Sequence, residues 1–241
     1  MKKTMFFIAA AVLLTGCTNV ARFDYNAAQG TTAAFQDAGA GAGTIAVPPF
    51  LDQRGTTHPV GDHGSFYLGF IPLMPFGYVG MDEPEKSEDF VSLGWFHFNP
   101  QVDLADSAAM SLKASNLFAD VKRVGNVNQA DSDYIWRGIV TNTCYSGYMY
   151  SYCITYLLSP VLWVLGAPSG TSVNELWVRF ELIERKSGKA VWNYEYRGSD
   201  CINHWIYARV GKDTSLYAQM MKQAMNGALL DLSQKLPALG Q

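Results

Sequence analysis

The sequence of 241 residues lacks the features that would point to nucleic-acid binding or to common catalytic chemistry. It has 18 lysine and arginine residues against 21 aspartates and glutamates, a formal net charge of −3, and no basic run. Since proteins bind nucleic acids largely by neutralising phosphates, this balance argues against nucleic acid as the main partner. The sequence also contains no GxSxG, no HExxH and no phosphate-binding glycine loop, so no motif predicts an enzyme.

Metal ligands in a recognisable pattern are also missing. None of the 4 cysteines belongs to a CxxC pair, which argues against zinc. His58 and His63, with Asp62 between them, lie in a glycine- and proline-containing loop whose spacing matches no common ligand set, so a solvated loop is the simpler interpretation. Cys201 and His204 could pair as nucleophile and base, but a separation of three residues does not establish that geometry. We predict no catalytic residue, no metal and no cofactor.

The opening residues, MKKTMFFIAAAVLLTGC, have the order of a secretory signal: lysines, an apolar run and then small residues. Their end, Leu14 to Cys17, resembles the lipobox of bacterial lipoproteins, in which the signal is cut before a cysteine that becomes acylated. The resemblance implies that residues 1–16 are the signal and that Cys17 carries acyl chains. The alternative is a plain secretory signal with a chance cysteine.

Acylation would be sufficient to anchor the protein to a membrane, because two or more acyl chains hold a protein stably without a transmembrane helix. In enteric-type sorting, aspartate after the cysteine favours the inner membrane, and here Thr18 follows Cys17. The resemblance therefore implies an outer-membrane protein, attached through its lipid and facing the periplasm.

After the anchor, residues 17–43 are rich in alanine and glycine and are predicted to be a flexible lipid tether. The remaining residues, 44–241, are of a length that suits one domain. Within it, the stretch 51–101 lacks clear periodicity and is predicted to be a long insert, which in a compact domain is usually functional.

Periodicity in the rest of the domain predicts an α+β fold. Alternation of apolar and polar residues is strongest in two runs separated by a short turn, which predicts an antiparallel hairpin. Helical spacing of apolar residues occurs twice, after aspartates that can cap a helix. We predict a mixed, mainly antiparallel sheet with two main helices packed on one face. The predicted strands are 44–50, 121–124, 133–143, 175–184 and 190–197, and the predicted helices are 103–119 and 213–236.

Four short motifs occur at intervals along the domain: Ile45 to Phe50 with Asp52 and Arg54, Leu117 to Val121, Ala130 to Tyr134, and Gly188 to Trp192. These motifs resemble those of periplasmic envelope lipoproteins with a Tol-like amino-terminal or curli-secretion-lipoprotein-like fold. The resemblance implies a binding or assembly module rather than a catalyst.

Two uncharged, proline-containing segments stand out: Ile154 to Pro168, and GFIPLMPFGYVGM at 69–81. A spanning helix needs about 20 apolar residues, and Pro160 would interrupt a helix in the first segment. Each segment could be buried beneath the sheet, or exposed against lipid or an apolar partner. Nearby tyrosines suit an interface but also suit an edge strand. We predict that both segments form one interaction surface that includes Leu73, Met74, Phe76, Leu158, Val161, Leu162, Trp163 and Leu165.

Besides Cys17, the chain has three cysteines, which in an oxidising periplasm can form one disulfide. We predict that Cys144 pairs with Cys153 and closes the loop CYSGYMYSYC, if strands run into and out of that loop. Pairs that involve Cys201 are the alternatives.

Together these features predict an envelope lipoprotein with no catalytic role, an accessory or assembly module that binds another cell-envelope component. A carrier with an apolar groove for lipid or glycan is the alternative, and a hydrolase is the weakest of the three.

Overall fold

The computed structural model describes residues 21–26, 43–55, 63–86, 96–129, 131–208 and 214–239. These residues form β-strands (β), α-helices (α) and 3-10 helices (η). The elements are β1 Ala21–Arg22, β2 Thr44–Val47, β3 Leu51–Asp52, η2 His63–Phe70, β4 Phe76–Met81, η3 Pro84–Lys86, β5 Phe96–His97, α2 Pro100–Ser115, β6 Asp120–Arg123, η4 Val127–Gln129, β7 Tyr134–Asn142, β8 Tyr145–Tyr150, α3 Ser159–Val164, β9 Gly170–Glu184, β10 Ala190–His204 and α4 Ser215–Leu239.

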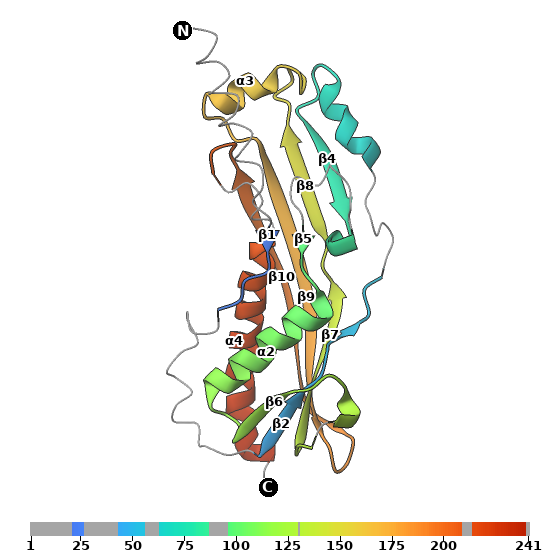
Figure 1. The fold of residues 1–241 in the computed structure, drawn as a ribbon, viewed down its shortest axis with the longest axis vertical. Helices are drawn as coiled ribbons and strands as arrows, with labels where there is room; N and C mark the ends of the chain where they lie inside the picture. The colour runs from blue at the N-terminus through green and yellow to red at the C-terminus, as the bar shows by residue number, and fades with distance from the viewer. Residues whose placement is uncertain are drawn as a thin grey trace, which may run out of the picture.

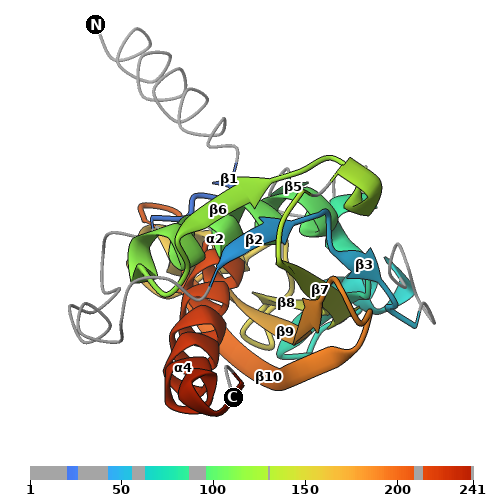
Figure 2. The ribbon, with the colours of Figure 1, turned by 90° about the horizontal axis from the view of Figure 1, so that it is seen from below.

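One mixed sheet organises these elements, in the order β4-β8-β9-β7-β2-β6, with β10 also paired to β9 and β3 to β7. The pairs around β9 and between β4 and β8 are antiparallel, whereas β2 and β3 pair in parallel with their neighbours. Viewed from below, the sheet curls round α2 and α4, which lie on its concave side (Figure 2). The predicted α+β fold, with a mainly antiparallel sheet and two main helices on one face, is confirmed.

The central hairpin is longer than predicted. Both strands have 15 residues, so β9 begins at Gly170 and β10 continues to His204. The sequence pattern missed the extra length because the side chains that point inward there, Ser172 and Asn174, are polar although they are buried. At a rise of about 3.3 Å per residue, each strand extends roughly 50 Å, which gives the molecule its long axis.

The hairpin runs along the long axis and through both the lower and the upper half of the molecule, as Figure 1 draws them. In the lower half β9 pairs with β7, and Leu176, Val178, Phe180 and Leu182 point into the core beneath α2 and α4. In the upper half β9 pairs with β8, which pairs with β4, and neither α2 nor α4, the long helices of the described residues, covers these strands. The buried apolar cluster there is small and consists of Val79, Met81 and Tyr145.

Both main helices differ from prediction at their ends. Helix α2 begins at Pro100 rather than Asp103, because Asn99 is the N-cap and the Asp103 carboxylate accepts a hydrogen bond from the Asn99 N–H. It ends at Ser115 because Asn116 adopts the left-handed conformation, with φ of 55°. Helix α4 continues two residues past Pro237, which was predicted to stop it. The predicted cap Asp213 lies outside the described residues.

The insert 51–101 contributes to the sheet instead of forming only an irregular loop. Its residues Phe76–Met81 form β4, the edge strand paired with β8. Two of its six residues, Gly77 and Gly80, are glycines, which have low strand propensity, so the sequence pattern did not predict this strand. Gly77 is required by packing, since a Cβ atom there would lie 2.2 Å from the Phe66 carbonyl oxygen.

Part of the predicted tether is docked on the domain. Ala21 and Arg22 pair in parallel with β5, and the ring of Phe23 stacks on Phe98 with centroids 5.3 Å apart. The Tyr25 hydroxyl hydrogen-bonds the Ser111 hydroxyl on α2, and burial raises the pKa of Tyr25. The chain from 21 to 26 is therefore part of the folded body, which corrects the prediction of a free tether throughout 17–43.

Candidate functional site

The upper end of the molecule exposes a group of apolar side chains on η2, on α3 and on the turns beside them (Figure 1). Leu73 is 82% exposed, and Leu157 and Leu165 are each 78% exposed. We call this surface the apolar tip. Its members are Tyr67, Leu68, Phe70, Ile71, Leu73, Ile154, Leu157, Leu158, Val161, Val164, Leu165 and Tyr207.

Most residues of the predicted interaction surface lie at this end, with one clear correction. Leu73, Leu158, Val161 and Leu165 are exposed members of the tip, while Met74 and Leu162 are half-buried. Phe76 is partly exposed on β4, with its ring against Tyr148.

Trp163 is only 8% exposed and so does not belong to the exposed surface. Helix α3 has six residues, and Ser159 and Trp163, four apart, lie on its single inward face. Of the remaining residues of the helix, Pro160, Val161 and Val164 are exposed and Leu162 is half-buried.

Backbone hydrogen bonds join the two uncharged segments, as the prediction of one surface requires. The Leu73 N–H donates to the Cys153 carbonyl at 3.0 Å, and the Tyr156 N–H donates to the Gly69 carbonyl at 2.9 Å. The N–H groups of Ser151 and Tyr152 both donate to the Pro75 carbonyl. Segments far apart in sequence thus form one preformed unit.

Tyr156 holds the unit together from below. Its ring lies 5.3 Å from that of Phe66 and 5.1 Å from that of Phe70, and its hydroxyl donates to the Met149 carbonyl at 3.1 Å. The ring fills the space that a side chain on Gly69 would need, since a Cβ atom there would lie 2.0 Å from it. Burial raises the pKa of Tyr156 to about 12.

Backbone strain is concentrated at the same end. Among the described residues, positive φ outside glycine occurs at Leu73, Tyr152, Cys153 and Thr155 of the upper end, and elsewhere only at Asn116. For residues with a Cβ atom this conformation is unfavourable, and it persists only where the surroundings enforce it. The tip therefore keeps its shape at a cost in stability.

Charged residues are absent from the two segments that carry every tip residue except Tyr207. No aspartate, glutamate, lysine or arginine occurs at 63–81 or at 144–174. An exposed apolar surface of this kind is unusual on a soluble monomer. The sequence prediction missed the contributions of η2 and of Tyr207, although the uncharged run at 63–81 was a signal for the former.

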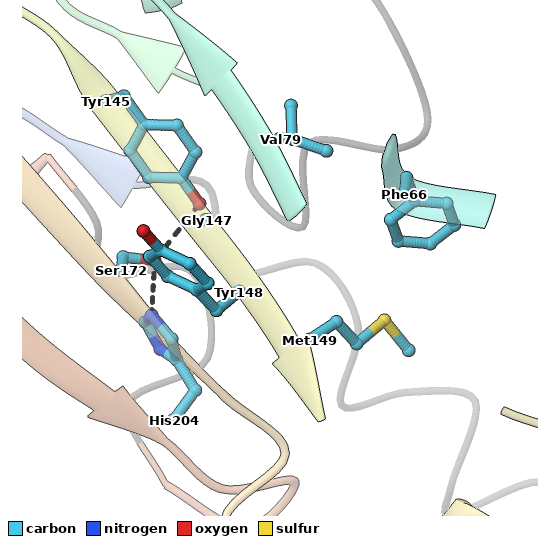
Figure 3. A pocket seen from close by; sticks show the side chains of 8 residues that line it. All are labelled: Phe66, Val79, Tyr145, Gly147, Tyr148, Met149, Ser172 and His204. Atoms are coloured by element: carbon cyan, nitrogen blue, oxygen red, sulfur yellow. Dashed lines mark hydrogen bonds between the residues drawn. The ribbon is translucent and has the colours of Figure 1, made fainter. Parts of the chain in front are cut away.

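Beneath the tip, β8, β9 and β10 meet at a buried polar chain (Figure 3). The Tyr145 hydroxyl lies 3.0 Å from Ser172 Oγ, which lies 2.7 Å from His204 Nε2. A serine beside a histidine can form a nucleophile and a base, but both residues are buried. The cavity next to them holds about 10 Å³, roughly the space of one water, so a substrate has no room there.

The cysteines do not form the predicted disulfide. Cys144, Cys153 and Cys201 are free thiols. Cys144 and Cys153 flank strand β8, and six extended residues span about 20 Å, whereas a disulfide needs Cα atoms within about 7 Å. The loop predicted between them is itself a strand. Cys201 and His204 lie three residues apart on β10. The Cys201 side chain is exposed, whereas the His204 side chain is buried.

Other predicted sites lie partly beyond the described chain. Cys17, His58 and Asp62 fall outside the described residues, as does the side chain of His63. In the part of the chain that the structure does describe, no three His, Cys, Asp or Glu side chains gather as metal ligands. None of the described helices combines the length and apolarity needed to cross a membrane.

Comparisons with known proteins give distant structural likeness only. No family model and no curated protein matches the chain. Protein XCC0632 from Xanthomonas campestris, of family DUF330, has 13% identity and a TM-score of 0.38, over 79% of this chain and 81% of that one. A PelC dodecamer from Paraburkholderia phytofirmans has 14% identity and a TM-score of 0.35, over 77% and 85%. A putative neuraminyllactose-binding hemagglutinin homolog from Helicobacter pylori has 7% identity and a TM-score of 0.37, over 82% and 87%.

These neighbours come from bacteria, but the TM-scores are too low for their functions to be carried over to this chain. The chain is defined by its own features: an α+β domain whose long hairpin carries an uncharged apolar tip. The resemblance to Tol-like and curli-secretion-lipoprotein-like proteins stays a prediction.

If Tyr156 holds the two tip segments together, its loss will loosen the tip. Tyr156→Ala is expected to lower the free energy of unfolding by about 3 kcal/mol, as for other buried aromatic side chains, and to expose 154–168 to limited proteolysis. The matched variant Tyr156→Phe keeps the ring and loses only the hydrogen bond to Met149, so about 1 kcal/mol is expected. Equal proteolysis of Tyr156→Ala and the wild type would contradict this role.

Proposed function

We propose that this protein is a lipid-anchored accessory or assembly module of the bacterial outer membrane, and that it binds another envelope component through the apolar tip. The observation that carries the proposal is the tip itself. Twelve large apolar side chains are exposed there, and eleven of them lie on two segments that contain no charged residue. Leaving such a surface in water is unfavourable, so we infer that a second component covers it.

A catalytic role is less well supported because the Ser172–His204 pair is closed off from substrate. A carrier role would need an apolar recess. The cavity beside Ser172 is too small, and a larger recess of about 280 Å³ is lined by polar groups such as Asp133, Glu184 and Lys186. Neither recess fits an acyl chain, which favours a docking function over carriage.

The docking role predicts that charge at the tip affects binding but not folding. Leu73→Asp combined with Leu165→Asp is expected to change the free energy of unfolding by less than about 1 kcal/mol, because both side chains are exposed. Co-purification of envelope components from detergent-solubilised cells should then be lost. Trp163→Asp places a charge in a buried site and is expected to cost several kcal/mol.

The matched control is Leu230→Asp, because Leu230 is 51% exposed on α4 and lies outside the tip. It should leave both stability and co-purification unchanged. A large loss of stability in the Leu73 and Leu165 double variant would mean that these side chains act as core.

The anchor has a separate test. If Cys17 carries the acyl chains, Cys17→Ala should release the mature chain into the soluble periplasmic fraction or leave it with its signal attached. Cys201→Ala is the control for loss of a cysteine, and it should fractionate with the outer membrane as the wild type does. A Cys17→Ala protein that loses its signal and still fractionates with the outer membrane would exclude the acyl anchor.

A further inference from the structure

We infer that the apolar tip inserts into the lipid interface of the bilayer that holds Cys17, so that the protein contacts its membrane at two places. The inference rests on the proposed lipid anchor and names the component that covers the tip. Three independent features of the chain support it: the position of the amino-terminal strand, the chemistry of the tip and its shape.

The first feature is the short connection between the anchor and the body. Ala21 belongs to β1 and is fixed by pairing with β5, so only residues 18–20 separate it from Cys17. Four residue steps span at most about 14 Å. An acylated Cys17 would therefore keep Ala21 within about 14 Å of the membrane surface, whereas a free tether to residue 43 would allow the body to drift far away.

The docked strand also orients the body. In Figure 1, β1 lies between the tip and the two main helices, and the described chain runs from it away from the tip. Phe23 and Tyr25, which follow β1, are held against Phe98 and α2. The end of β1 that leads to the anchor is thus the end nearer the tip, and a short connection there turns the tip toward the bilayer.

The second feature is the chemistry of the tip. Its aliphatic members suit the boundary between headgroups and acyl chains, and an exposed tyrosine such as Tyr67 suits the headgroup level, where the ring meets apolar groups and the hydroxyl meets water. Tyr152 and Tyr207 satisfy their hydroxyls by donating to the carbonyls of Pro168 and Val164. The segments 63–81 and 144–174 present no charge that a charged protein partner could recognise, and lipid requires none.

The third feature is shape. Helix α3 and η2 both lie at the upper end of the elongated body (Figure 1). Five exposed residues in and around α3, namely Leu157, Leu158, Val161, Val164 and Leu165, surround only two inward ones. A protein partner would need a pocket shaped to this surface, whereas a bilayer accepts it without shape complementarity.

Photo-crosslinking in defined vesicles tests the inference. Benzoylphenylalanine replaces Leu165 in the full-length, acylated protein, which is reconstituted into vesicles of phosphatidylethanolamine and phosphatidylglycerol. The matched control carries the same probe at Leu230, which is exposed on α4 and would lie outside the 5–10 Å or so reached by interfacial side chains. Thermal melting verifies that both variants fold.

We expect mass spectrometry to find phospholipid adducts at position 165 at least about tenfold more often than at position 230, because only the first enters the interface. The same pair of variants is irradiated in intact cells. Protein adducts at position 165, with no lipid adduct in vesicles, would overturn the lipid inference and leave the proposed docking function standing. An equally low yield at both positions in vesicles and in cells would overturn both.

Discussion

The structure depends on one continuous antiparallel hairpin, β9 with β10, that runs through both halves of the molecule. Over Leu176 to Leu182 its inward side chains belong to the main core, and α4 packs across it. From Asn174 towards the upper end the same two strands extend past α2 and α4, the long helices in the described part of the chain, and support β8, β4 and the tip. The upper half buries few apolar side chains of its own, so its position is set by strand pairing with the lower half.

This arrangement explains how an apolar surface can stay exposed without collapsing. The tip segments are fixed by backbone hydrogen bonds to each other and by the buried ring of Tyr156, while their largest side chains point outward. Strained backbone at Leu73 and Thr155 indicates that the shape is enforced by its surroundings. A preorganised surface loses little conformational entropy on binding, which favours docking.

The sequence predicted those elements whose buried side chains are apolar and whose exposed side chains are polar. Alternation identified the lower part of β9 and β10, and helical spacing identified α2 and α4, because those elements have one apolar face. The sequence did not predict strands whose buried positions are polar or whose residues have low strand propensity. Buried Ser172 and Asn174 concealed the upper hairpin, and glycines concealed β4.

For the candidate site, the two uncharged segments indicated where exposed apolar residues gather. The sequence did not indicate which side chains of these segments point outward and which point inward. The inward face of α3 is set by tertiary packing, so Trp163 was assigned to the wrong side. The strand between Cys144 and Cys153 likewise separates two cysteines that a loop would have brought together. No periodicity in residues 17–43 indicated that Phe23 and Tyr25 dock on the body.

Amide hydrogen exchange tests the central claim, a preformed tip that docks into lipid, most directly. The full-length acylated protein and its Leu73→Asp, Leu165→Asp double variant would be compared in the same phospholipid vesicles. The account predicts slower exchange at 67–73 and 157–165 in the wild type than in the variant, with identical exchange in α2 and α4. Equal exchange of the tip segments in both proteins would contradict it.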